Sequence, residues 1–243
     1  MDGILLIDKP AGWTSFDVVA KVRGILRSGT RSSVVVSSKT TNYPAISTKI
    51  KVGHTGTLDP AATGLMIIVI GSYCKRASEF SKLDKTYQVE LTLGKNSNTG
   101  DKEGELTDIS VLQPTQEQVL EVVSSFVGKQ LQTPPAYSAV KIDGQRAYNL
   151  ARAGKEVFIQ PREVVIHEIK DVKYKYPKIL FNTHVSSGTY IRSLASDIGK
   201  KLGTGAFMSE LRRTTVGVFS LKDSMVINDI TLKKINDGIK LAK

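Results

Sequence analysis

The sequence contains little cysteine and no long hydrophobic run, and each shortage excludes a class of protein. A single cysteine, Cys74, among 243 residues rules out an internal disulfide and a cysteine-based zinc cluster. The longest apolar run, residues 65–70, is far shorter than the roughly 20 residues of a membrane-spanning helix. The amino-terminal stretch, MDGILLIDKP, has neither the basic segment nor the cleavage site of a secretion signal. These absences predict a cytoplasmic protein without a membrane partner.

The chain is also short of acidic residues, and the shortage is concentrated in one region. Lys and Arg number 34 against 23 Asp and Glu, which gives a net charge of +11. Between residues 18 and 58 there are seven basic residues and no acidic one. A cationic surface suits a polyanion, because each neutralised phosphate releases condensed counterions. Nucleic acid is therefore the favoured partner, although charge alone also fits a basic protein with no nucleic-acid role.

Hydrophobic patterning predicts an α+β fold, a mostly antiparallel mixed sheet flanked by helices. Strand-like segments come in runs instead of alternating strictly with helices, which favours antiparallel pairing. The expected strands are residues 3–8, 65–71, 85–94, 163–176, 178–186 and 215–221, and the expected helices are residues 16–26, 115–128 and 190–203. Thr14 or Ser15 is expected to cap the first helix, and an Asp143-Gly144 turn to join a strand to a further helix. No linker divides the chain, so one domain is the simplest count.

One stretch interrupts this regular pattern. Residues 28–48 contain ten Ser or Thr and little periodicity, which predicts a flexible insertion, with a brief strand possible at SVVVS. On composition alone, a disordered surface loop without function is the favoured interpretation.

The segment VGHTGTLDPAATG, residues 52–64, carries one acidic side chain in a constrained turn. Asp59 precedes Pro60 and is therefore biased toward an extended backbone. The three glycines of the segment permit backbone geometries closed to other residues. We expect a tight loop that presents one carboxylate at the start of a buried strand. An ordinary structural aspartate in a turn is the alternative that the local pattern leaves open.

The same segment, GHTGTLDPAATG, resembles the catalytic signature of the TruB-type pseudouridine synthases, which isomerise uridine 55 in the T arm of tRNA. Further segments similar to those of the family follow in the family's order. They are GILLIDKPAGWTS, GSYCK, DKTYQV, PPAYSAVKIDGQRAYNLARAG, SSGTYIRSLASDIGKKLG and AFMSELRRTTVGVF. Together they span most of residues 3 to 220. The resemblance implies the pseudouridine synthase fold and an RNA isomerase that flips its target base.

The resemblance identifies Asp59 as the catalytic aspartate, which breaks the bond between uracil N1 and the ribose. An aspartate has an ordinary pKa of about 3.9 and is ionised at neutral pH. It can act as a nucleophile at C1′ or as a base at C2′. The sequence leaves the covalent and the glycal route open.

Other site residues are also implied by the resemblance. Tyr87 matches the tyrosine that stacks on the flipped uracil and assists removal of the C5 proton, and Arg192 matches the arginine that pairs with the catalytic aspartate. Leu211 matches an apolar residue near the flipped base, and Tyr190 is expected to contact the substrate. Without the family, Tyr87 and Leu211 would be core residues and Arg192 a solvated helix residue.

Three further residues are expected to contact the RNA. His54 matches a wedge that fills the space left by flipped bases; a general base and a plain loop histidine are the alternatives. Lys9 and Lys75 match basic residues that border the site and are expected to hold phosphates, although any lysine is a surface residue by default. Cys74 has no implied role.

No cofactor and no metal are expected. The three histidines, His54, His167 and His184, lack the HExxH or cysteine spacing of a zinc site. There is no phosphate-binding P-loop and no dinucleotide fingerprint. Isomerisation is redox-neutral and needs no energy source.

The chain departs from the family pattern at two places. Residues 1–222 are expected to form the catalytic domain, including the insertion at about 28–48, and residues 223–243 a short helical tail without a complete C-terminal RNA-binding (PUA) domain. The basic residues of and beside the insertion are hypothesised to add phosphate contacts; they are Arg27, Arg31, Lys39, Lys49 and Lys51.

The expected partner is the T arm of tRNA, bound by a monomer without a guide RNA. The alternative function is a tRNA-binding folding chaperone whose catalysis is secondary or lost.

Overall fold

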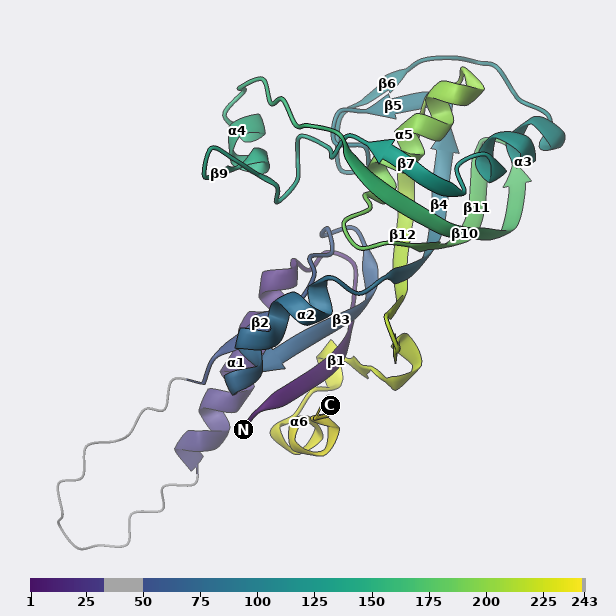
Figure 1. Cartoon of the computed structure of the whole chain (residues 1–243). Helices are drawn as coiled ribbons and strands as arrows, with labels where there is room; N and C mark the ends of the chain where they lie inside the picture. The colour runs from purple at the N-terminus through teal and green to yellow at the C-terminus, as the bar shows by residue number, and fades with distance from the viewer. Residues whose placement is uncertain (33–49, 242–243) are drawn as a thin grey trace, which may run out of the picture. The chain divides into compact units, whose positions relative to one another are not determined.

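The computed structural model describes residues 1–32 and 50–241, which form two compact units (Figure 1). Unit 1 comprises Met1–Lys82 with Val216–Lys243, and unit 2 comprises Leu83–Thr215. Each unit is described by itself. The assignment of residues 1–222 to one catalytic domain stays a prediction. Most of the expected insertion, including the possible SVVVS strand, lies outside the described residues.

Unit 1 is built on a small sheet with the strand order β14-β1-β3-β2. β1 and β3 pair antiparallel from Gly3 opposite Ile70 to Lys9 opposite Gly64, and β14 lies parallel to β1. Both central strands are buried almost throughout, as their uninterrupted apolar sequences predict. The elements in the amino-terminal part of unit 1 are β1 (Gly3–Lys9), α1 (Ser15–Ser32), β2 (Val52–His54), β3 (Thr63–Ile70), η1 (Gly71–Arg76) and α2 (Ala77–Ser81).

Of the two expected capping residues of α1, Thr14 and Ser15, Thr14 makes the capping hydrogen bonds. The Thr14 hydroxyl accepts a hydrogen bond from the Asp17 backbone N–H at 3.1 Å, and the Asp17 carboxylate accepts one from the Thr14 N–H at 2.8 Å. Ser15 instead bonds to a distant loop. The helix also continues six residues past its predicted end at residue 26. Phe16, at the start of the helix, is exposed, whereas Val18 packs in the core.

The carboxyl-terminal segment completes unit 1. It contains β13 (Phe219–Ser220), η2 (Leu221–Asp223), β14 (Met225–Val226), η3 (Ile227–Asp229) and α6 (Leu232–Gly238). Ile4 and Lys240 exchange two backbone hydrogen bonds of 3.0 Å, so the tail is tied to β1. The expected strand at residues 215–221 is interrupted, because Gly217 has a φ of 54° and separates β13 from the strand before it.

Unit 2 contains the larger sheet, with the strand order β12-β4-β11-β10-β7. The pairs β4–β11, β11–β10 and β10–β7 are all antiparallel. Its strands are β4 (Lys85–Leu93), β5 (Lys95–Ser97), β6 (Leu106–Asp108), β7 (Gly128–Gln132), β8 (Lys141–Ile142), β9 (Gln145–Arg146), β10 (Arg162–Lys175), β11 (Lys178–Val185) and β12 (Ala206–Val216). The odd-numbered positions of β4 are buried, as its alternating sequence predicts.

The helices of unit 2 are α3 (Gln116–Ser124), α4 (Ala147–Arg152) and α5 (Ile191–Leu202). α3 packs on α5 and β10, and α5 packs on β4, so both helices cover the sheet, whereas α4 follows the small β8–β9 hairpin (Figure 1). A capping box of Thr115 and Gln118 begins α3, and Gly203 ends α5 with a φ of 70°. The predicted Asp143-Gly144 turn forms the hairpin, with φ of 48° and 82°.

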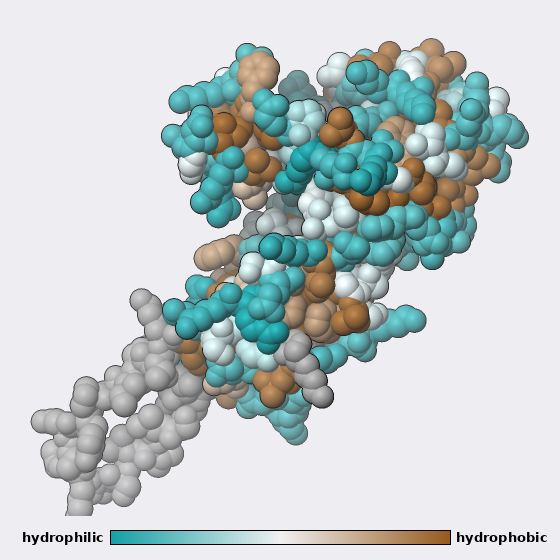
Figure 2. All heavy atoms as spheres, in the orientation of Figure 1, coloured by the Kyte–Doolittle hydropathy of each residue, from teal (hydrophilic) through white to brown (hydrophobic). Residues whose placement is uncertain are grey.

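The predicted fold class is confirmed: the chain is a mixed α+β protein with largely antiparallel strand pairing. On the face shown in Figure 2, hydrophilic residues cover much of each unit. None of the helices in the described part of the chain is both long and apolar enough to cross a bilayer.

Candidate active site

In unit 1, Asp59 lies in the loop that joins β2 to β3. The loop begins after His54 and ends at Thr63, and the Asp59 carbonyl accepts a hydrogen bond from the Ala62 N–H at 3.1 Å. The Asp59 side chain is half-buried. As predicted, a tight turn presents a single carboxylate at the start of a buried strand.

A buried hydroxyl group holds the residue directly before Asp59. The Ser15 Oγ accepts a hydrogen bond from the Leu58 N–H at 2.8 Å and donates one to the Leu58 carbonyl at 2.9 Å. Both residues are almost completely buried, with 4% and 3% of their surface exposed. Because water is excluded here, the loop depends on this hydroxyl group to satisfy both backbone groups.

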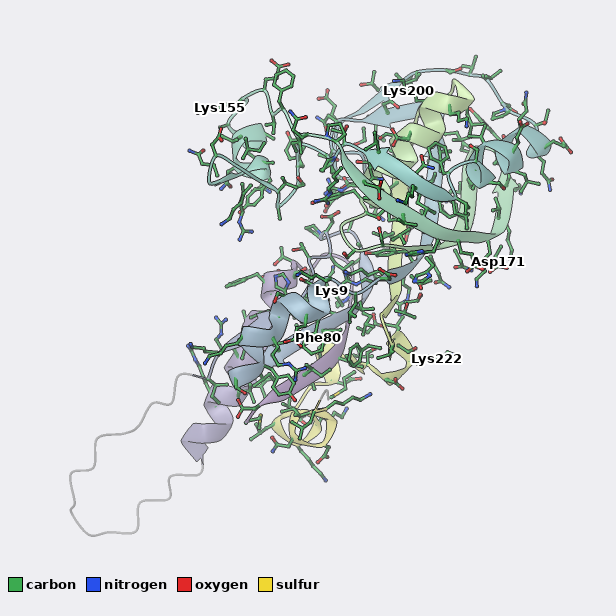
Figure 3. All side chains as sticks on the ribbon, viewed as in Figure 1. Lys9, Phe80, Lys155, Asp171, Lys200 and Lys222 are labelled. Atoms are coloured by element: carbon green, nitrogen blue, oxygen red, sulfur yellow. The ribbon has the colours of Figure 1, made fainter. Side chains whose placement is uncertain are left out.

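A buried ammonium group holds the residue directly after Asp59. Lys9 is completely buried at the end of β1 (Figure 3), and its Nζ donates to the Pro60 carbonyl at 3.1 Å. It also donates to the carbonyls of Pro10 and Trp13, at 2.9 and 2.7 Å. The Gly12 N–H adds a second bond to the Pro60 carbonyl, at 2.9 Å. The end of β1 and the start of α1 therefore hold the Asp59 loop by hydrogen bonds on both sides of Asp59.

This position of Lys9 argues against the phosphate contact expected from the sequence. A completely buried lysine whose ammonium group donates to three backbone carbonyls is oriented inward, whereas a phosphate contact requires a reachable charge. Lys75, in η1, is exposed and retains the predicted role as a proposal. His54 is the last residue of β2, opposite Ile68 of β3, and is half-buried.

In unit 2, Tyr87 and Leu211 lie on neighbouring strands. Tyr87 is on β4, paired with Thr183 of β11, and has 7% of its surface exposed. Leu211 is on β12, the strand next to β4, and has 9% exposed. Both side chains belong to the apolar interior, as the alternative of a plain core residue expects, and their contact with a flipped base stays a prediction.

Arg192, in the first turn of α5, is held by groups that the sequence did not point out. Its Nη1 donates to the Thr99 carbonyl and its Nη2 to the Tyr137 carbonyl, both at 2.9 Å. Its Nε lies 3.7 Å from the Asp101 carboxylate, and the two side chains are only 6% and 5% exposed. Arg192 is thus a buried, oriented cation instead of a solvated helix residue.

Asp101 is the main residue that sequence reasoning missed. It lies in the polar segment NSNTGDKEG, residues 96–104. Its Oδ1 accepts hydrogen bonds from the Thr99 hydroxyl at 2.6 Å and from the Glu103 N–H at 3.1 Å. Gly100 has a φ of 79°, and an added Cβ would approach the Arg192 Cβ to 3.1 Å. The only signal in the sequence was a Gly-Asp pair at the centre of this loop.

Tyr190 occupies the N-cap position of α5, without a side-chain capping hydrogen bond, and is fixed by two contacts. The Gln132 side chain accepts a hydrogen bond from the Tyr190 N–H at 2.7 Å and donates one to the Tyr190 carbonyl at 3.1 Å. The Arg162 guanidinium lies over the Tyr190 ring, 5.1 Å from its centroid, and donates to the Gly188 carbonyl. The half-exposed ring is therefore stacked on a cation.

A second buried cation lies two residues before Tyr87. Burial and, to a lesser extent, the charge of Arg213 together lower the pKa of Lys85 to about 8, with Asp84 acting in the opposite direction. Lys85 donates a hydrogen bond to the Leu83 carbonyl.

The predicted site residues therefore fall into two groups. Asp59, His54, Lys9 and Lys75 belong to unit 1, and Tyr87, Tyr190, Arg192 and Leu211 belong to unit 2. Within unit 1 the structure joins Lys9 to the Asp59 loop, and within unit 2 Tyr190 lies two residues before Arg192 at the start of α5. The predicted pairing of Asp59 with Arg192 links the two units and stays a prediction.

Comparison with known proteins gives the class and then the family. Residues 44–191 match the family model for the TruB family pseudouridylate synthase N-terminal domain, and residues 192–242 match that for the tRNA pseudouridylate synthase B C-terminal domain. The chain is thus a protein of the pseudouridylate synthase class. It belongs to the TruB family.

Curated relatives and a solved structure agree with this assignment. The chain is 39% identical over 98% of its length to a tRNA pseudouridine synthase B of Clostridium acetobutylicum, 75% of which is covered. It is 42% identical over its whole length to a tRNA pseudouridine synthase B of Dehalococcoides mccartyi, 73% of which is covered. A chain in the crystal structure of a Cbf5-Nop10-Gar1 complex matches 98% of this chain at 27% identity and a TM-score of 0.68, and 57% of that longer chain is covered.

Proposed function

We propose that this chain is a tRNA pseudouridine synthase that isomerises uridine 55 in the T loop of tRNA. The observation that supports this most is the loop carrying Asp59, gripped on both sides by Ser15 and Lys9, in a chain of the TruB family. The reaction breaks the bond between N1 and C1′ and forms a bond between C5 and C1′. A proton leaves C5 and one is gained at N1, so neither oxidant nor cofactor is required.

In this proposal Asp59 acts on the ribose. Its carboxylate attacks C1′ as a nucleophile or removes the C2′ proton as a base, and either step releases the uracil for rotation. The rigid loop increases the rate, because a carboxylate that is already held in its reactive geometry does not pay the entropy cost of reaching that geometry in each turnover.

The residues of unit 2 act on the base and on the charge of Asp59. Tyr87 stacks on the flipped uracil and helps to remove the C5 proton, with Leu211 packing beside it. Arg192 pairs with the Asp59 carboxylate and keeps it ionised once water is excluded. Asp101 orients the Arg192 guanidinium, whose Nε is 3.7 Å away, so that the cation is preformed before the RNA arrives.

RNA binding follows from the charge of the chain. Lys75 and the basic residues near the insertion contact phosphates, and Tyr190 contacts the substrate. Flipping a base costs a few kcal/mol of lost stacking, which His54 partly offsets by occupying the vacated space. Lys9 supports the Asp59 loop in place of a phosphate contact. The enzyme acts in the cytoplasm as a monomer and without a guide RNA.

An isolated T-arm stem-loop with a 5-tritiated uridine at the target position tests the proposal. The parent chain releases tritium because the C5 hydrogen is lost, whereas Asp59→Asn lowers the rate by about 10⁴-fold or more. Both proteins bind the stem-loop with similar affinity, because the substitution is isosteric and removes no phosphate contact.

Asp237→Asn provides the matched control, since it makes the same substitution at an exposed position of α6 in the same unit. It keeps the parental rate. Full activity of Asp59→Asn would reject the catalytic role. RNA binding without tritium release from the parent chain would instead support the chaperone alternative.

A further inference from the structure

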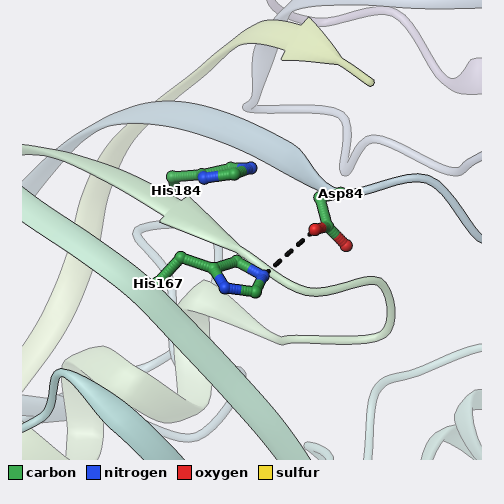
Figure 4. Close-up of side chains that lie close together, drawn as sticks. All are labelled: Asp84, His167 and His184. Atoms are coloured by element: carbon green, nitrogen blue, oxygen red, sulfur yellow. Dashed lines mark ion pairs between the residues drawn. The ribbon is translucent and has the colours of Figure 1, made fainter. Parts of the chain in front are cut away.

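Unit 2 contains a cluster of metal-ligating side chains that the proposed reaction does not use. Two of the chain's three histidines, His167 and His184, face the carboxylate of Asp84 (Figure 4). Asp84 directly precedes β4, His167 lies in β10 and His184 in β11. One ligand atom from each residue lies within 4.8 Å of both others. The cluster therefore joins three consecutive strands of the sheet.

An irregularity in β10 accounts for the convergence of the two histidines. Ile166 pairs with Val185, but the next pairing is Glu168 with His184, so His167 is the extra residue of a β-bulge. In a regular ladder adjacent residues point to opposite faces, whereas a bulge turns its extra residue toward the face of the residue opposite. The bulge thus places the His167 ring beside the His184 ring, with centroids 4.7 Å apart.

The geometry of the cluster is close to that of a metal site. The His167 Nε2 lies 3.1 Å from an Asp84 carboxylate oxygen. Two ligands on one tetrahedral zinc ion, each about 2.0–2.1 Å from it, are roughly 3.3 Å apart. Because the ligand atoms lie within 4.8 Å of one another, His184 has to approach by at most about 1.5 Å to complete the set, which rotation of the exposed His167 and the half-buried His184 permits. Glu168 is not counted as a ligand, because it is ion-paired with Lys170 at 2.9 Å.

We propose that Asp84, His167 and His184 bind a divalent transition metal ion of the zinc class. A plain ion pair explains the contact between His167 and Asp84, but it does not require a second imidazole at the same carboxylate. Two imidazoles and one carboxylate are a borderline-soft donor set, which suits Zn²⁺ and Co²⁺ and disfavours Mg²⁺ and Ca²⁺. Linear spacing gave no zinc motif because the ligands come from three different strands.

The bound ion would act as a structural cross-link. It would tie the residue that leads into β4, the strand of Tyr87, to β10 and β11. Three protein ligands leave a fourth position for water, and no step of the proposed isomerisation passes through the ion.

Calorimetric titration of the full chain, prepared without a histidine tag, with ZnCl₂ tests the proposal. One Zn²⁺ per chain is expected, and 100-fold excess over Kd raises Tm by about 5 °C or more. Co²⁺ gives visible d–d absorption, whereas MgCl₂ produces neither signal. His167→Gln, His184→Gln and Asp84→Asn each weaken zinc binding by more than the roughly 10–100-fold typical of outer-shell substitutions.

Two control variants replace the remaining histidine and the single cysteine of the chain. His54→Gln and Cys74→Ser bind zinc like the parent, and the metal-free Tm of each ligand variant stays close to the parental value. The proposal is overturned if the parent shows no saturable binding up to 1 mM zinc. It is equally overturned if binding persists in the ligand variants or is lost in either control variant.

Discussion

Replacing Ser15 by alanine removes the hydroxyl group that holds the backbone next to Asp59. The Ser15 Oγ makes hydrogen bonds of 2.8 and 2.9 Å to the N–H and the carbonyl of Leu58, in a region from which water is excluded. An unsatisfied buried donor or acceptor costs about 1–3 kcal/mol. For a chain of this size a loss of about 2 kcal/mol lowers Tm by roughly 4–8 °C.

The same substitution is expected to lower kcat by more than its loss of folding stability alone would explain. A shift of about 1 Å in a catalytic group lowers the rate by about 100-fold. We therefore expect kcat for a T-arm substrate to fall by about 10- to 100-fold in Ser15→Ala, while KM changes only a few-fold. Single-turnover tritium release measures the chemical step, and thermal unfolding measures stability.

Thr14→Ala is the matched control for this experiment. It removes the neighbouring hydroxyl group, which caps α1 through hydrogen bonds with Asp17. Loss of a helix cap costs about 1 kcal/mol, so this variant loses a comparable part of its stability. Its kcat should stay within about two-fold of the parent. Equal losses of kcat in the two variants, or a normal kcat in Ser15→Ala, would refute the positioning role.

Two further substitutions test charges in unit 2. Asp101→Asn removes the charge beside the buried Arg192 guanidinium and should lower kcat without weakening tRNA binding, whereas Asp108→Asn, which breaks an exposed ion pair with Lys95, should leave both unchanged. Burial lowers the pKa of Lys85 from 10.5 to about 8, so between these values the unfolded chain binds more protons. Stability against urea should therefore rise with pH from 8 to 10.5, by about 3 kcal/mol at most, and Lys85→Met should lack this rise. If Lys85→Met showed the same rise in stability with pH, the rise would have to come from groups other than Lys85.

The elements predicted correctly are those whose signals are local. β1 and β3 are uninterrupted apolar runs, and β4 alternates with period two. α3 begins with a capping box. Each signal lies within a few residues, so one sequence is enough to find it. The predicted end of α1 at residue 26 was wrong, because a serine-rich composition does not by itself stop a helix that is already propagating.

The candidate site was predicted unevenly for a related reason. Asp59 lies in a motif of thirteen residues, and its family resemblance carries the role. The groups that hold it come from elsewhere: Ser15 looked like a helix cap, and Lys9 like a surface lysine. Both contacts join residues about 43 to 51 positions apart. Asp101 was missed because its role depends on its contact with the buried Arg192, which is distant in the sequence, and not on its neighbours along the chain.

The histidine cluster shows the limit of spacing arguments most directly. A motif such as HExxH works because one helical turn brings its ligands to one face. In a sheet, ligands meet through strand register, and the register here depends on the bulge at His167. A single extra residue in a ladder changes which side chains share a face, and it leaves no periodic trace in the sequence. The lack of a zinc motif therefore argued only against a site built on one helix or loop, and it carried no weight against one assembled from three strands.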